Sequence, residues 1–323
     1  MNVENLYPLK LKPVLKDIIW GGKRLSEEYG KSDNPNRKIA ESWELTVHKN
    51  GVNIIENGEH AGKSLEDLFK SAKSIVSPDY NSEKFPLLIK FIDAEQNLSV
   101  QVHPDNEYAE KYANELGKTE VWYIVDSKPG AKIAYGLNND YTREDLQNLI
   151  DNGKFEDCLN YVEVKPGDVY FIPAGLVHAI GEGILIAEIQ QNSDTTYRFY
   201  DYNRIGVDGK PRELHINQAL DVCIKTKTEY KPPESVENSL SEIISKCQYF
   251  TVMKCIVSDT ENVEINAAYS FVSVICTDGE GKIVHDDKTY TIKKGDSYFF
   301  PAGTGKSIIN KTCGNFVFLV TTL

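Results

Sequence analysis

The sequence predicts a mainly β protein built from two related units, and an internal repeat carries this prediction. Residues 165–178 and 293–306 are identical at eight of fourteen positions, where background composition would give about one match. Each copy holds a short run of β-branched and aromatic residues between turn-forming residues, which is typical of a strand, a turn and a second strand. The first copy ends in His178 and the second in Lys306, so we expect the two units to have different functions.

The other elements are expected from local patterns. Helical insertions are predicted in the first unit: one capped by Ser64 with an apolar face at Leu65, Leu68 and Phe69, one over 105–116 ending at Gly117, one capped by Thr142 and ending at Gly153, and one over 217–224. Strands are predicted over 250–257, 270–275, 298–300 and 316–320. A polar, proline-rich linker over 226–240 divides the chain into a catalytic domain, 1–235, and a second domain, 236–323, which lacks a metal site.

Four residues of the first repeat copy stand at a distinctive spacing. Gly167, Pro173, Gly175 and His178 resemble a motif of the cupin family, whose members are small β-barrels of the jelly-roll type. In cupins the histidine of this motif is a metal ligand. The resemblance therefore implies two cupin units, of which only the first keeps the metal-binding histidine.

A second segment supplies the partner ligands. Gln101 and His103 are two residues apart, so in a strand they would share one face, and Glu120 opens another predicted strand. Cupins carry a His-x-His segment and then a glutamate here, and Gln101 replaces the first histidine. By this resemblance Gln101, His103, Glu120 and His178 hold one metal ion per chain. The donor set suits zinc with an open position, and two histidines with a carboxylate could also hold Fe(II). The remaining histidines match no ligand spacing and are expected to be surface or structural residues: His48, His60, His215 and His285.

The same residues resemble the type I mannose-6-phosphate isomerase family in its shorter bacterial form. The similar segments are Ile-Trp-Gly at 19–21, Ala-Glu-Ser-Trp at 40–43, the ligand segment at 98–105, and the stretch from 178 to the Arg-Phe-Tyr-Asp-Tyr-Asn-Arg at 198–204. The resemblance implies a catalytic role for Arg198 and places Glu188 and Lys118 in the substrate pocket as candidate catalytic residues, although Glu188 could equally orient a neighbouring side chain. It implies substrate binding by Trp20, Glu41, Lys90, Ser99 and Arg204. Arg204 departs from longer eukaryotic members, which have lysine there, and arginine does not deprotonate in proteins.

The implied reaction is a zinc-dependent interconversion of mannose 6-phosphate and fructose 6-phosphate. A proton would move between C1 and C2 through an enediol or enediolate, with zinc and Arg198 stabilising negative charge on oxygen. The general base stays open between Glu188, a hydroxide on the metal, and Lys118. Two alternatives remain: a cupin Fe(II) oxygenase using His103, Glu120 and His178, and a non-catalytic protein that senses sugar phosphates.

The composition limits the kinds of molecule that the protein is expected to bind. A net charge of −12 argues against nucleic acid or an anionic membrane, so we expect a small sugar phosphate, bound by the basic set Lys90, Lys118, Arg198 and Arg204. Six scattered cysteines without a Cys-x-x-Cys pair favour reduced thiols. No signal peptide or membrane-spanning run is evident. We therefore expect a cytoplasmic protein that is a monomer or a small homo-oligomer.

Overall fold

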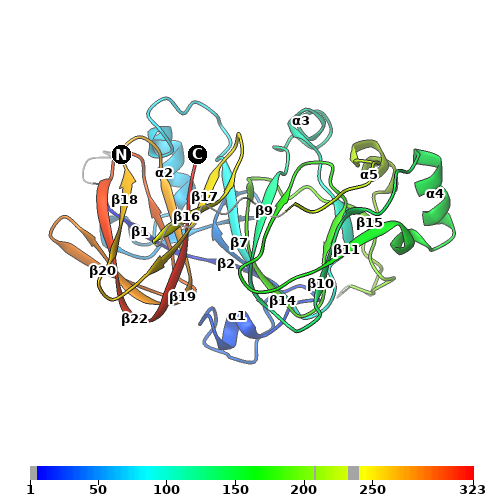
Figure 1. Ribbon diagram of the computed structural model, residues 1–323. Helices are drawn as coiled ribbons and strands as arrows, with labels where there is room; N and C mark the ends of the chain where they lie inside the picture. Colours follow the sequence, from blue (N-terminus) through cyan, green and yellow to red (C-terminus); the bar gives the residue numbers. More distant parts are fainter. Residues whose placement is uncertain (1–5, 207–208, 232–239) are drawn as a thin grey trace.

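The computed structural model describes residues 6–206, 209–231 and 240–323 and has two β-rich units side by side (Figure 1). The first unit contains a six-stranded and a five-stranded sheet, and the second is built around a nine-stranded sheet. The prediction of a mainly β fold is confirmed.

The order of strands within each sheet differs from their order along the chain. The six-stranded sheet contains, from edge to edge, β12 (Val169–Ile172), β9 (Glu120–Ser127), β14 (Ile184–Gln191), β7 (Leu87–Ala94), β3 (Glu41–Leu45) and β2 (Val14–Lys16). The five-stranded sheet contains β11 (Leu159–Glu163), β10 (Lys132–Leu137), β13 (His178–Ile180), β8 (Val100–Val102) and β15 (Tyr197–Tyr200). The nine-stranded sheet contains β16 (Ser241–Lys246), β17 (Thr251–Val257), β22 (Gly305–Thr322), β19 (Val272–His285), β21 (Ser297–Phe300), β1 (Leu9–Lys12) and β6 (Ile54–Ile55), with β18 (Asn262–Ala267) paired to β22 and β20 (Lys288–Lys293) paired to β19. A small hairpin joins β4 (Val47–His48) and β5 (Gly51–Val52).

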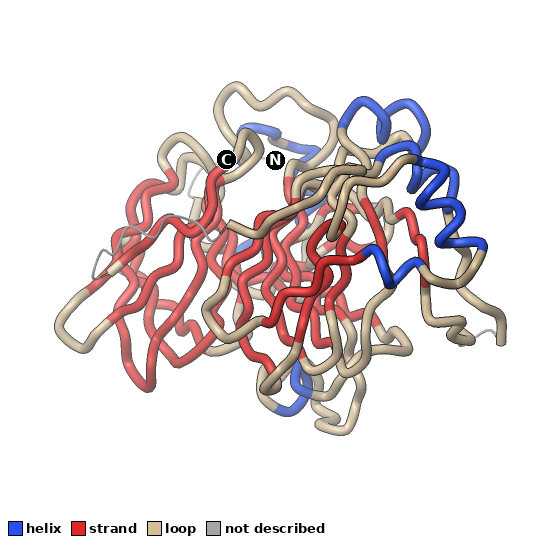
Figure 2. The backbone as a smooth tube through the Cα atoms, turned by 45° about the vertical axis from the view of Figure 1, so that its right-hand side comes forward, coloured by secondary structure: helices blue, strands red, loops and turns tan. Residues whose placement is uncertain are grey.

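The helices are short. They are α1 (Arg24–Glu27), α2 (Leu65–Ser71), α3 (Asn106–Ala113), α4 (Arg143–Asp151) and α5 (Ile216–Val222), with 3₁₀ turns at Gly58–His60, Lys73–Ile75 and Phe155–Cys158. Leu146 of α4 and Leu220 of α5 pack against the five-stranded sheet. Figure 1 shows α4 and α5 on the side of the first unit that faces away from the second, and Figure 2 shows helices gathered on the same side.

The six-stranded sheet lies in the middle of the molecule, which explains why every residue of β7 and β14 is buried. Side chains alternate between the two faces of a strand. On β9, Trp122 joins the core of the first unit, whereas Val121 joins a core shared with Phe299 of the second unit. A sheet buried on both faces is apolar almost throughout, so its polar side chains stand out as candidates for function.

The second unit takes strands from both ends of the chain. Leu9 of β1 pairs with Phe299 of β21, and Leu11 pairs with Ile55 of β6. The nine-stranded sheet therefore includes residues from the predicted first domain, so a single cut in the sequence does not separate the two sheet systems. The predicted boundary between residues 235 and 236, and most of the expected linker, lie outside the described residues.

Both copies of the repeat form the predicted strand, turn and strand. β12 leads through Gly175 to β13, and β21 leads through Gly303 to β22. The two glycines have φ values of 87° and 93°, a region that residues with a side chain rarely adopt. The turn conformation thus explains why the repeat keeps this glycine.

The predicted helices are found with shifted ends. Ser64 and Thr142 cap α2 and α4 as expected. The prediction that Gly117 ends the helix starting near residue 105 is wrong, because α3 stops at Asn114, which adopts the left-handed conformation. Asparagine tolerates that conformation. Gly117 is instead constrained by the backbone of Asn106, which a Cβ at 117 would approach to 2.6 Å.

We expect Leu9→Ala to lower the free energy of unfolding of the whole chain by about 2–5 kcal/mol, since it would leave a cavity in the shared core. Denaturant unfolding measures this value, and Lys12→Ala on the exposed face of the same strand is the control. Unchanged stability in Leu9→Ala would contradict the placement of β1.

Candidate active site and metal centre

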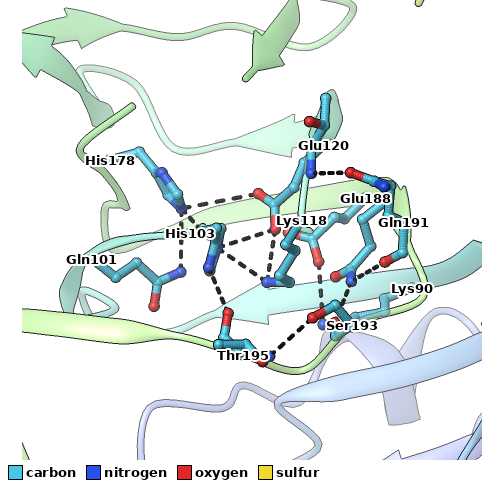
Figure 3. Close-up of polar contacts among 12 residues, drawn as sticks. Lys90, Gln101, His103, Lys118, Glu120, His178, Glu188, Gln191, Ser193 and Thr195 are labelled. Carbon is cyan, nitrogen blue, oxygen red and sulfur yellow. Dashed lines mark hydrogen bonds and ion pairs between the residues drawn. The ribbon is translucent and has the colours of Figure 1, made fainter. Parts of the chain in front are cut away.

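Three potential metal ligands converge between the two sheets of the first unit (Figure 3). His103 follows β8, His178 begins β13 and Glu120 begins β9, and all three are buried. The Nε2 atom of His103 lies 3.2 Å from Nε2 of His178 and 3.2 Å from Oε1 of Glu120. The fold thus joins ligand candidates that stand 75 residues apart in the sequence.

Backbone carbonyls fix the orientation of both imidazole rings. His103 Nδ1 lies 2.9 Å from the carbonyl oxygen of Thr195, and His178 Nδ1 lies 2.8 Å from that of Leu176. A carbonyl oxygen only accepts hydrogen bonds, so we assign the proton to Nδ1 in both rings. Each Nε2 then presents a lone pair to the centre of the cluster.

Burial keeps the two imidazoles neutral. It lowers the pKa of His103 to about 3, with help from the charge of Lys118, and it lowers the pKa of His178 as well. Burial acts to raise the pKa of Glu120, but Lys118 holds that pKa well below its usual range. Two lone pairs and a carboxylate therefore face one another, a set of donor atoms that a divalent metal ion would satisfy together.

The spacing of these atoms fits a metal ion. Two ligands about 2.1 Å from a tetrahedral zinc ion are roughly 3.4 Å apart, and the separations here are 3.2, 3.2 and 3.9 Å. The side-chain amide of Gln101 lies 3.4 Å from His178 Nε2. Rotating that amide by half a turn would offer its oxygen as a fourth ligand. The Lys118 ammonium is 2.7 Å from Glu120 and 3.1 Å from His103, at the edge of the cluster.

A polar cavity of about 360 Å³ opens beside the cluster. Its lining brings together eight residues predicted from the sequence: Trp20, Glu41, Lys90, Ser99, Gln101, Lys118, Glu188 and Arg198. His103, Glu120 and His178 lie behind the lining, in contact with Lys118 or Gln101. Arg204, predicted to bind substrate, is not among the lining residues.

The six-stranded sheet supplies a row of polar side chains to this cavity. Strand register places Lys90 beside both Trp43 and Glu188, and Glu188 beside Trp122. Lys90 Nζ lies 3.2 Å from Glu188 and 3.6 Å from Glu41. Burial opposes the charge of Lys90, but these two carboxylates raise its pKa.

The indole N–H of Trp122 connects this row to the cluster. It donates to Glu188 at 2.9 Å and to Glu120 at 3.1 Å. The Glu188 carboxyl group is buried and close to the charge of Glu120, and both effects raise its pKa. Its other oxygen, Oε1, faces the Lys90 ammonium at 3.2 Å. A buried carboxylate with a raised pKa beside a cavity is suited to proton transfer.

The five-stranded sheet supplies Arg198, which lies opposite Gln101 in the strand register. Within the described residues its guanidinium forms no ion pair, and its buried Nε has no hydrogen-bond acceptor. Burial and the neighbouring Arg212 lower the pKa of Arg198. A half-buried cation without an ion-pair partner at the wall of a cavity is a candidate contact for an anionic ligand.

Several lining residues were missed by sequence reasoning: Lys16, Ile18, Trp43, Asn50, Ile92, Leu98, Ile180, Asp194, Thr196 and Arg212. Trp43 belongs to the Ala-Glu-Ser-Trp segment that carries part of the family resemblance, so that segment was the available signal. Asp194 accepts a hydrogen bond from Asn50 at 2.7 Å. No local pattern around Asp194 or Arg212 indicates that they reach the cavity.

The histidines that match no metal-ligand spacing are not part of the cluster of His103, Glu120 and His178. His48, His60 and His285 are buried. His48 Nδ1 accepts the backbone N–H of Asn50, and His60 stacks on Tyr7. These contacts fit the structural role expected for them.

The second repeat copy has no comparable cluster. Lys306, at the position of His178, pairs with Glu264 at a distance of 2.9 Å. Over residues 6–206, 209–231 and 240–323, His103, Glu120 and His178 form the only group of three or more His, Cys, Asp or Glu side chains with metal-binding proximity.

The fold and the site define the class of the chain, a mainly β cupin protein with a candidate metal centre beside a polar cavity. Residues 8–143 match the family model of the type I phosphomannose isomerase catalytic domain, and residues 241–318 match that of the mannose-6-phosphate isomerase cupin domain. Cupin character of the first unit stays a prediction.

Individual relatives agree with these models. The chain is 41% identical over 303 residues to mannose-6-phosphate isomerase ManA of Bacillus subtilis, covering 93% of this chain and 94% of that protein. It is 39% identical over 296 residues to the mannose-6-phosphate isomerase of Streptococcus mutans, covering 91% and 92%. A crystal structure of mannose 6-phosphate isomerase from Bacillus subtilis superposes with a TM-score of 0.90 at 34% identity, covering 98% and 99% of the two chains. The chain belongs to the type I mannose-6-phosphate isomerase family.

Two further expectations concern the thiols and the membrane. All six cysteines are free, and four of them are buried: Cys158, Cys223, Cys255 and Cys276. None of the helices in the described part of the chain has the length and apolar character that a membrane span requires.

We expect one divalent metal ion per chain and its loss in His178→Ala, because Lys306 offers no lone pair at the equivalent position. Elemental analysis of purified protein measures the ratio. His285→Ala is a matched control, since His285 is also buried but lies in the second unit. Two tightly held ions, or full metal content in His178→Ala, would contradict this assignment.

Proposed function

We propose that the protein interconverts mannose 6-phosphate and fructose 6-phosphate with one zinc ion, held by His103, Glu120, His178 and Gln101. The observation that carries the proposal is the cation-demanding cluster beside a cavity that contains a proton-transfer candidate and an unpaired arginine. The names of the relatives point to the same activity. When bound, zinc would act as a Lewis acid toward the substrate oxygens.

Glu188 is the best candidate for the general base. The isomerisation requires one group that removes a proton from C2 or C1 and returns it to the neighbouring carbon. Glu188 lines the cavity and has a raised pKa, and its Oε1 atom is held by an ion pair with Lys90 at 3.2 Å. Lys118 is less suited to act as a base, because its ammonium is engaged by Glu120 at 2.7 Å.

Fixed positive charge would stabilise the intermediate. An enediolate carries negative charge on oxygen, and donors that are already in place lower the barrier without reorganising. Lys118 and Arg198 lie on the cavity wall, from the six-stranded side and the five-stranded side respectively. Trp122 would keep Glu188 aligned with the metal-binding carboxylate through its shared N–H.

Two other functions use the same residues. A cupin Fe(II) oxygenase would need the two histidines and Glu120 as a facial triad, and turnover would then consume oxygen. A sugar-phosphate sensor would bind the same ligands without converting them. The raised pKa of Glu188 beside the cluster favours proton transfer over either alternative.

The cysteines indicate the cellular setting. Free, mostly buried cysteines suit a reducing compartment, so we propose the cytoplasm. The chain would act as a monomer or a small homo-oligomer.

We expect the metal-replete protein to convert mannose 6-phosphate and to leave unphosphorylated mannose unchanged at equal concentration. Binding energy from the phosphate helps to orient the reacting carbons, so its absence should reduce kcat as well as affinity. A coupled assay for fructose 6-phosphate, run with an oxygen electrode, measures both reactions. Chelation should abolish activity and zinc should restore it, whereas oxygen uptake or absence of the product would refute the proposal.

We expect Arg198→Ala to reduce kcat by about 10²–10³-fold while metal content and melting temperature are kept, since a preorganised charge would be lost from the developing oxyanion. Steady-state kinetics of the Arg198→Ala enzyme measures kcat and KM. If KM rises and kcat stays near that of the wild type, Arg198 contacts only the phosphate.

We expect Glu188→Gln to lose nearly all turnover yet keep the fold, because glutamine preserves the shape but cannot accept a proton from carbon. Exchange of the substrate C2 proton with solvent deuterium, followed by NMR, reports the step directly. Glu213→Gln, at an exposed carboxylate, is the control. Wild-type exchange in Glu188→Gln would assign the base to another group.

A further inference from the structure

A buried carboxylate beside the cavity binds two arginines that sequence reasoning did not connect. Asp201 lies one residue beyond β15 and is 4% exposed. Arg212 donates to it from Nε at 2.7 Å and from Nη2 at 2.6 Å, which is the paired geometry of a strong arginine–carboxylate contact. Arg204 donates to the same carboxylate through Nη2.

The two arginines differ in what else they reach. Arg204 also donates to the backbone carbonyls of Asp201 and Asn97 and packs on the ring of Tyr202. Its guanidinium is therefore occupied by the protein, and it lies outside the cavity lining. Arg212 does line the cavity, together with Arg198. The bonds to Asp201 use two of its five N–H donors.

Charge in the cavity is unevenly distributed. The positive charge of Lys90 is compensated by Glu41 and Glu188, and that of Lys118 by Glu120. On the opposite side Arg198 has no carboxylate partner within the described residues. Arg204 and Arg212 share the single carboxylate of Asp201. Arg198, Arg204 and Arg212 thus have one paired carboxylate among them on this side, and Asp194 is a further acid in the cavity lining.

We propose that Arg212 binds the phosphate of the substrate, and that Asp201 and Arg204 are positioning residues that hold Arg212 at the cavity. This inference rests on the proposed function and identifies how the sugar phosphate is selected. A phosphate monoester carries close to two negative charges at neutral pH, and Arg212 has N–H donors left over from its bonds to Asp201 to bind it. The two compensated lysines, by contrast, can serve the reacting end of the sugar.

The arrangement also explains the arginine at position 204. A lysine there could make one point contact with Asp201, but an arginine can bind the carboxylate and two backbone carbonyls at once. In this chain residue 204 thus acts through Asp201 and Arg212 and has no part in proton transfer.

The test compares Arg212→Gln with Arg143→Gln, a control at a surface arginine that pairs with Asp221 and does not line the cavity. We expect Arg212→Gln to raise KM for mannose 6-phosphate by about 10- to 100-fold, the range for a charge-assisted contact. The inhibition constant of inorganic phosphate should rise by a similar factor. The change in kcat should be smaller, and metal content should stay at the wild-type value.

A second pair of variants tests the positioning role. Arg204→Gln should raise KM in the same direction by a smaller factor, and Arg204→Lys should recover part of the loss. Wild-type KM and phosphate inhibition in Arg212→Gln would overturn the proposal, as would an Arg204→Gln enzyme indistinguishable from the wild type. A wild-type protein without isomerase activity would instead reject the proposed function, and phosphate binding to Arg212→Gln would then be measured by calorimetry to judge the phosphate contact independently.

Discussion

The convergence of three hydrogen-bond acceptors in a buried space is the constraint on which the rest of the structure depends. His103, His178 and Glu120 come from opposing sheets, and each can only accept at the point where they meet. Two backbone carbonyls hold the imidazole protons on the far side of the rings. Without a cation this arrangement would be costly, so the two sheets and their connecting turns must be stable enough to maintain it. A middle sheet buried on both faces provides that stability.

The same central sheet explains how the cavity combines rigidity with reactivity. Its polar residues are paired across neighbouring strands, so Lys90, Glu188 and Trp122 occupy fixed positions relative to Glu120. On the opposite wall, carboxylates compensate less of the positive charge, which is carried by Arg198 and by the two arginines that bind Asp201. A substrate with a carbonyl at one end and a dianion at the other matches this polarity. The second unit holds no comparable cluster in the described chain and supports the central sheet through the shared core.

Much of this arrangement could be predicted from local patterns. The repeat identified the strand and turn around His178, because Pro173 and Gly175 restrict the backbone there. The alternation of Gln101 and His103 predicted that both would lie on one face, and resemblance supplied Glu120 and most of the predicted lining residues. These signals succeed where a short segment determines its own conformation.

The missed features depend on contacts between distant segments. No property of residues 9–12 indicates that their strand pairs with β21, near the other end of the chain. Arg212 reaches the cavity through a carboxylate eleven residues away, and a loop arginine without a motif resembles any surface charge. The prediction of a helix end at Gly117 fails because the role of this glycine, close packing on Asn106, depends on a contact that sequence alone does not reveal.

The most direct test of the central claim is a titration of apo protein, labelled with ¹⁵N in its histidine side chains, with zinc while the imidazole nitrogens are followed by NMR. Two histidines, His103 and His178 by assignment, should be neutral and protonated at Nδ1 before zinc is added. Their Nε2 signals alone should shift, and the change should saturate at one equivalent. Binding through Nδ1, involvement of other histidines, or saturation at two equivalents would contradict the account.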